Sequence, residues 1–105
     1  MSRAPVLLER CEVGRKTPLD GRLELAPESA AQLVPLGAEF AVVALGAEGV
    51  GRLETMACTC GKSGSAGATH LHHFAASPLF RDLTAGEPVR IELDEVRGAL
   101  VVGPG

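Results

Sequence analysis

Aromatic side chains are scarce in this sequence. It contains no tryptophan and no tyrosine, and its aromatic content of 3% consists of Phe40, Phe74 and Phe80. Proteins that bind single-stranded nucleic acid by base stacking need exposed aromatic rings, whereas a chain of 105 residues needs its large side chains for the core. We therefore expect the phenylalanines in the core and no base-stacking function.

Long apolar runs are also lacking. The run that precedes Glu9 and Arg10 is shorter than the core of a signal peptide and much shorter than a transmembrane helix. We therefore predict no membrane partner and a cytoplasmic location. The length and the apolar content of 46% predict a single domain over residues 1–105. In a reducing compartment, three cysteines favour metal binding or thiol reactivity over a disulfide framework.

An excess of positive charge is missing as well, because the formal net charge is −3. Strong nonspecific binding of nucleic acid normally requires many basic residues on one face. Basic residues outnumber acidic ones only in residues 1–22. The composition therefore argues against a general nucleic-acid binder and leaves a local basic patch as an alternative.

Short segments in which apolar and polar residues alternate predict a mainly β fold. Strands are expected at residues 5–13, 22–25, 39–46, 49–58, 70–76, 88–94 and 98–102, with hairpin connections near Gly46 and Gly98. Since each strand must bury one face, six or seven short strands predict a small barrel or a compact sandwich.

Two short helices are expected beside the strands, and residues 14–21 are expected to form turns. The first helix covers residues 27–34, with Ala30, Leu33 and Val34 on its buried face. The second begins after Ser77 as N-cap and ends at Gly86.

Two cysteines and two histidines flank a glycine-rich segment, and residues 58–73 read CTCGKSGSAGATHLHH. Because side chains alternate along a strand, Cys58 and Cys60 are expected to share a face, and so are His70 and His72. If the segment between them forms a hairpin loop, two thiolates and two imidazoles meet in the tetrahedral set that zinc prefers. We predict zinc as the cofactor and these four residues as its ligands.

The residues around this motif are expected to have other roles. His73 should lie on the opposite face, whereas Phe74 should share the face of the ligands. Cys11 is expected in the core, with a role as a further ligand as the alternative if its strand runs alongside the motif. The nearest acidic residues are Glu54 and Asp82. Their spacing from the motif in the sequence does not indicate that either serves as a catalytic base, and we expect them to be solvated.

Several functions are compatible with this motif. Four protein ligands would form a structural zinc site in a non-enzymatic binding module for a protein or duplex DNA, and we favour this interpretation. Three ligands and a water would instead form a small metalloenzyme, and Cys58 and Cys60 alone would suit a metal or thiol sensor. The cysteines as half-buried apolar residues without metal are a further alternative, and homo-oligomerisation stays open.

Part of the motif is similar to the start of the cupin metal motif, in which a glycine precedes His-x-His. Gly64, His70 and His72 match it, but the glutamate of that family falls here on Ala76 or Ser77. The resemblance implies a metal-dependent oxygenase or isomerase as a minor alternative.

The order of the expected elements resembles the DNA-binding pseudobarrel of plant transcription factors and restriction-enzyme recognition domains. The resemblance covers residues 5–102 and includes the segment SPLFRDLTAGE and the spacing of Leu83, Gly86 and Val89. The chain is acidic and lacks the tryptophan common in the plant members. The resemblance implies that duplex DNA would be bound by basic turns, for which Arg15, Lys16 and Arg22 are the candidates.

Overall fold

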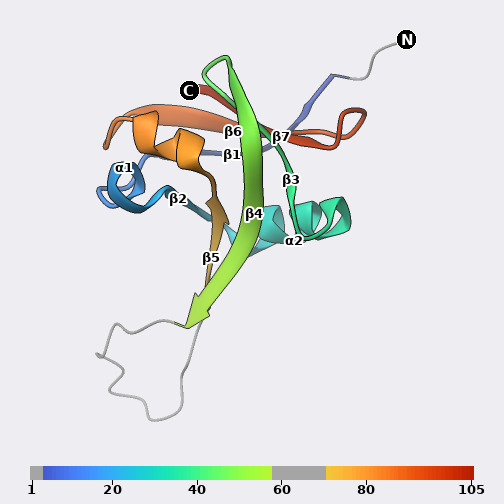
Figure 1. Ribbon diagram of the computed structural model, residues 1–105, viewed down its shortest axis with the longest axis horizontal. Coiled ribbons are helices and arrows are strands. Elements are labelled where there is room, and N and C mark those ends of the chain that lie inside the picture. The colour runs from blue at the N-terminus through green and yellow to red at the C-terminus, as the bar shows by residue number, and fades with distance from the viewer. Residues whose placement is uncertain (1–3, 58–70) are drawn as a thin grey trace.

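The computed structural model describes residues 4–57 and 71–105 and shows one curved β-sheet that forms a half-barrel. The prediction of a mainly β fold of six or seven short strands, as a small barrel or a compact sandwich, is confirmed, and the structure has seven strands. The strands are β1 (Val6–Glu12), β2 (Arg22–Leu25), β3 (Phe40–Ala44), β4 (Ala47–Ala57), β5 (Leu71–Ala76), β6 (Pro88–Asp94) and β7 (Ala99–Pro104), as Figure 1 shows. Their order in the sheet is β1-β6-β7-β3-β4-β5-β2. Neighbouring strands are antiparallel except β3 and β7, which are parallel.

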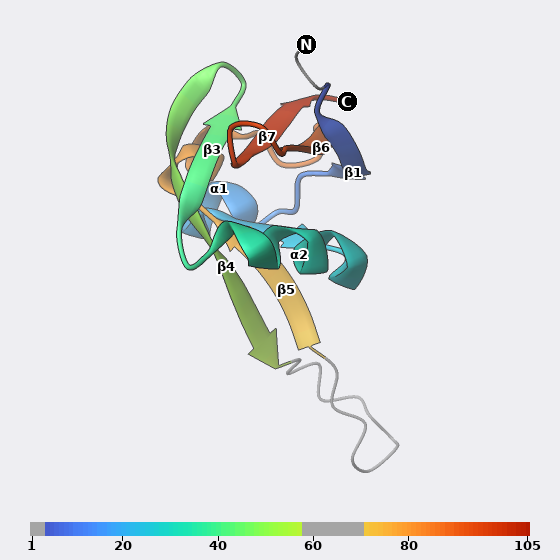
Figure 2. The same cartoon turned by 90° about the vertical axis from the view of Figure 1, so that its right-hand side faces the viewer.

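The longest strand, β4, belongs to both halves of this sheet. Its first residues pair with β3 as far as Gly51, and its remaining residues pair with β5 from Arg52 to Ala57. A Cβ atom at Gly51 would lie 2.7 Å from Val42 Cγ2 and 2.9 Å from the Ala76 carbonyl oxygen. Only glycine therefore fits at the position where β4 changes partners. Beyond it β4 pairs with β5, and the far ends of these two strands, past the last pair of β5 with β2, extend away from the rest of the sheet as a two-stranded arm (Figure 2).

The core lies against the inner face of the half-barrel and is mostly aliphatic. In β6 the alternation predicted from the sequence holds, because Val89, Ile91 and Leu93 are buried. The largest fully buried side chains of the described residues are Phe80, Leu23, Leu33, Ile91, Leu100, Val42, Val89 and Val102. Phe40 is buried too, but Phe74 is only half-buried. The expectation that all three phenylalanines lie in the core was therefore wrong for Phe74, which lies on the outer face of β5.

The first predicted helix is present as α2 (Pro27–Leu33), followed by the 3-10 turn η1 (Val34–Leu36). Pro27 occupies the start of the helix, where its missing N–H costs no hydrogen bond. Ala30 and Leu33 are buried as expected, but Val34 is 63% exposed. Val34 escapes burial because the α-helix ends before it and the chain continues as a 3-10 turn.

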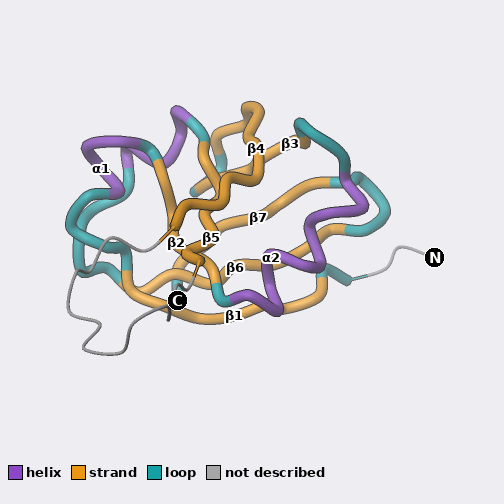
Figure 3. Tube along the Cα trace, turned by 90° about the horizontal axis from the view of Figure 1, so that it is seen from below, coloured by secondary structure: helices purple, strands orange, loops and turns teal. Residues whose placement is uncertain are grey.

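Two other short helices lie at one end of the half-barrel, away from α2 (Figure 3). The helix α1 (Thr17–Asp20) replaces the turns expected there, and it ends at Gly21, whose φ of 70° suits glycine. The second predicted helix is only the 3-10 helix η2 (Pro78–Asp82), although Ser77 caps it as predicted by accepting a hydrogen bond from the Leu79 N–H. The helix α1 contacts η2. No helix in the described ranges is long and apolar enough to cross a membrane.

Candidate functional site

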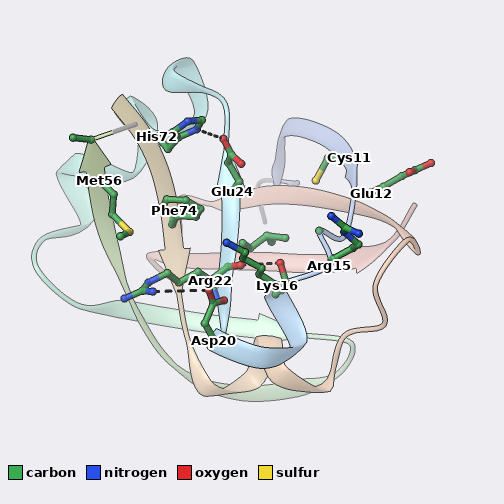
Figure 4. Close-up of a pocket in the computed structure, with 14 residues that line it drawn as sticks. Cys11, Glu12, Arg15, Lys16, Asp20, Arg22, Glu24, Met56, His72 and Phe74 are labelled. Carbon is green, nitrogen blue, oxygen red and sulfur yellow. Dashed lines mark hydrogen bonds and ion pairs between the residues drawn. The ribbon is translucent and has the colours of Figure 1, made fainter. Parts of the chain in front are cut away.

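A cleft of about 670 Å³ opens beside α1 and extends over the outer face of β2 and β5. Its walls come from the end of β1, the turn that follows it, α1, and the ends of β4 and β5 (Figure 4). The lining residues are Cys11, Glu12, Gly14, Arg15, Lys16, Thr17, Asp20, Arg22, Leu23, Glu24, Met56, Ala57, His72 and Phe74. Residues that the sequence assigned to two separate functions therefore meet at one site.

The predicted DNA-contacting residues Arg15, Lys16 and Arg22 all line this cleft, together with His72, one of the four predicted zinc ligands. The other three predicted ligands, Cys58, Cys60 and His70, lie outside the described residues. The structure thus brings the three basic residues together, while the complete zinc site stays a prediction.

The guanidinium group of Arg22 is already engaged by acidic side chains. Its Nε donates a hydrogen bond of 2.7 Å to Glu54 Oε1, and its Nη1 lies 3.9 Å from Asp20 Oδ2. Arg52 Nε donates to the other oxygen of Glu54 at 2.9 Å. Glu54 was expected to be solvated, but its side chain is only 19% exposed and bridges two arginines. Of the three predicted DNA contacts, Arg22 is thus the one least available to a phosphate.

These contacts also change the acid–base behaviour of the pair. The hydrogen bond from Arg22, and next to it the one from Arg52, lowers the pKa of Glu54, although burial acts in the opposite direction. The hydrogen bond to Glu54 raises the pKa of Arg22. Both groups therefore stay charged at neutral pH.

Arg15 and Lys16 differ from Arg22, because both are exposed and neither forms an ion pair within residues 4–57 and 71–105. Of the cleft's acidic residues, Asp20 contacts Arg22 and Glu24 contacts His72. Glu12 has no ion pair in the described part of the chain. Among the described residues, the charges of the cleft without an ion pair are therefore the two positive charges of Arg15 and Lys16 and the one negative charge of Glu12.

His72 is held by a carboxylate that the sequence analysis did not identify. Its Nδ1 lies 2.6 Å from Glu24 Oε2, across the pairing of β5 with β2. The rings of His72 and Phe74 share the outer face, with centroids 6.4 Å apart. Nothing in the sequence paired Glu24 with His72, because their contact depends on the register between two strands that are distant in the chain.

His73 lies on the other face of β5, as predicted, where its Nδ1 is 3.3 Å from Thr55 Oγ1. Cys11 packs against the core, as expected, and also lines the cleft. Burial, and next to it the nearby Glu9, raises the pKa of the Cys11 thiol. Because the thiolate is the nucleophile and the metal ligand, this environment disfavours both roles for Cys11.

No group of three or more His, Cys, Asp or Glu side chains within the described ranges is arranged to hold a metal ion. Those ranges contain only one of the four predicted ligands, so the zinc prediction does not depend on that result. No family model matches the chain, and no curated protein matches its sequence.

Proposed function

We propose that this chain is a zinc-binding module that binds a macromolecular partner and is not an enzyme. Zinc is held by Cys58, Cys60, His70 and His72. The main support is the β4–β5 ladder, whose last pair is Ala57 with Leu71. Cys58 directly follows one member of this pair in the sequence, and His70 directly precedes the other. The cysteine half and the histidine half of the ligand motif therefore adjoin the same residue pair at the end of the β4–β5 ladder.

The alternation of side chains supports the same ligand set. His72 and Met56 are paired and lie on the outer face of the arm. Positions separated by two residues share a face of a strand. We therefore expect strands continued past the end of this ladder to direct both cysteines and both histidines to that face.

The carboxylate of Glu24 also supports His72 as a ligand. Histidines that bind metal commonly donate the N–H of their other ring nitrogen to a carboxylate, which fixes the orientation of the ring. The contact of 2.6 Å between Glu24 Oε2 and His72 Nδ1 has this form. In the proposed site, Nε2 of His72 would therefore be the metal-binding atom.

A site with four protein ligands leaves no open position for substrate and adds to folding stability. Zinc at the end of the arm would order the wall of the cleft to which His72 and Met56 contribute. The function proposed for the metal is therefore to shape a binding surface.

Metal analysis of the purified, reduced protein tests this proposal. We expect one zinc per chain, loss of zinc in Cys58→Ser, and full retention in the control Cys11→Ser. The absence of stoichiometric metal, together with unchanged stability of Cys58→Ser, would overturn the proposal. The visible spectrum of the Co²⁺-substituted protein then reports the coordination. A water in the coordination sphere would favour the metalloenzyme alternative over the binding module.

A further inference from the structure

The strand β2 is the last in the sheet, and its open edge lies at the cleft. Arg22 uses both of its backbone groups away from β5, since its N–H donates to Asp20 Oδ1 at 3.0 Å and its carbonyl accepts from Thr17 Oγ1 at 2.8 Å. In an antiparallel pair, residues alternate between exchanging both hydrogen bonds with the partner strand and exchanging none. The backbone groups of Leu23 therefore face β5, and those of Glu24 face the open edge.

Side chains cap this edge on both sides of Glu24 but not at Glu24 itself. Asp20 and Thr17 bind the groups of Arg22, and Glu9 Oε2 accepts a hydrogen bond of 2.9 Å from the N–H of Ala26. Within the described residues, the N–H and the carbonyl of Glu24 have no hydrogen-bond partner. An open strand edge is a template for another extended chain, and here only one donor–acceptor pair is left uncapped.

The surroundings of this pair select the kind of chain that fits. On one side of the cleft, Arg15 and Lys16 carry positive charge without an ion pair in the described part of the chain. On the other side, Phe74 is half-buried and Met56 is 45% exposed, so both offer apolar surface. A strand added at the open edge of β2 lies away from β5, on the side of Arg15 and Lys16, so a peptide that carries acidic side chains would complement this side of the cleft.

We propose that the cleft binds an extended acidic peptide segment of a partner protein by β-strand addition. The peptide backbone pairs with the N–H and carbonyl of Glu24, and its carboxylates contact Arg15 and Lys16. This inference rests on the proposed binding function and names its partner, but it does not require zinc. Duplex DNA fits less well, because its phosphates offer no N–H to the Glu24 carbonyl and strong binding needs more than two unpaired cations.

Titration of the full chain with fluorescently labelled peptides tests the partner. The probe is a nine-residue peptide of alternating valine and glutamate, compared with its valine–lysine counterpart and with a short DNA duplex. We expect only the acidic peptide to bind, and Lys16→Glu to weaken it about tenfold. The control Arg97→Glu makes the same charge change in the turn between β6 and β7, which does not line the cleft, and should leave affinity unchanged.

Amide hydrogen exchange locates the contact. The bound peptide should slow exchange at Glu24 about tenfold or more, with little change at Arg22 and Ala26, whose N–H groups are already bonded. Failure of the acidic peptide to bind, tighter binding of DNA, or peptide binding with unchanged exchange at Glu24 would each overturn the proposal.

The same titration is repeated after chelation and compared with the metal content. Peptide binding by protein that holds no zinc as purified, before any chelation, would refute the zinc site alone. Stoichiometric zinc without peptide binding would refute the peptide site alone.

Discussion

The hydroxyl group of Thr17 is expected to stabilise the edge of the cleft, and its removal gives a sharp test. Thr17 is 3% exposed, and its Oγ1 donates a hydrogen bond of 2.8 Å to the Arg22 carbonyl. The substitution Thr17→Val keeps the shape of the side chain but leaves this carbonyl without its donor. A hydrogen bond contributes about 0.5–1.5 kcal/mol net, and an unsatisfied buried group costs about 1–3 kcal/mol.

Because Arg22 is only half-buried, water reaches part of this region and the lower part of that range applies. We therefore expect Thr17→Val to lower the free energy of unfolding by about 1–2 kcal/mol. For a domain of this size, that change lowers Tm by roughly 4–15 °C. The effect is large enough to measure against a total stability of about 5–15 kcal/mol.

Urea unfolding followed by circular dichroism is the suitable assay, because the chain has no tryptophan or tyrosine to serve as a fluorescence probe. Thr17→Ser retains the hydroxyl and should cost less than Thr17→Val. The control Thr84→Val changes an exposed residue and should stay within about 0.5 kcal/mol of the wild type. If Thr17→Val matched that control with an unchanged m value, the hydroxyl would have no stabilising role and the reasoning would be refuted.

Three further predictions concern other described residues. The lowered pKa of Glu54 means that its bond with Arg22 stabilises the fold at neutral pH, and this stability is lost as the pH falls through the lowered pKa. Urea midpoints measured from about pH 6 to about pH 3 should therefore fall less steeply in Glu54→Gln than in the wild type; equal slopes would contradict this. The half-buried thiol of Cys11, whose pKa is raised, should be alkylated more slowly in the native protein than in urea, as measured by mass spectrometry, and equal rates would show that it is fully accessible. Phe80 is fully buried, so Phe80→Ala should lower the unfolding free energy by about 3–5 kcal/mol, and a loss below about 1 kcal/mol in urea unfolding would count against its place in the core.

Predictions from the local sequence pattern succeeded where a regular alternation of apolar and polar residues, or a clear capping residue, specified the element. The strict alternation in residues 88–94 gave β6, and the Ser77–Pro78 pair correctly marked the start of η2. The length and type of the short helices were not predictable in the same way. Four or five residues form too few hydrogen bonds to specify a helix alone, and α1 forms with Thr17 buried and in contact with η2.

Four of the residues that line the cleft were selected from the sequence as functional residues, but the cleft itself was not predicted. Arg15, Lys16 and Arg22 were selected from a basic segment, and His72 from a separate metal motif. Their common cleft arises from the pairing of β2 with β5, which are separated by 45 residues between Leu25 and Leu71. Bringing these two strands together costs loop-closure entropy, which is offset by the packing of the whole core. Neither the cleft nor the Glu24–His72 contact therefore has a signal in the local sequence.

The sequence by itself determined the alternation of buried residues in β6, the sharing of one face by His72 and Phe74, and the overall class of fold. These properties follow from the alternation of side chains, which is a local property of an extended backbone. The tertiary structure alone decided that Glu54 pairs with Arg22, that Arg15 and Lys16 form no ion pair with the described residues, and that the backbone groups of Glu24 have no hydrogen-bond partner among them. Those outcomes depend on which strands become neighbours, and that choice is made by the packing of the complete core.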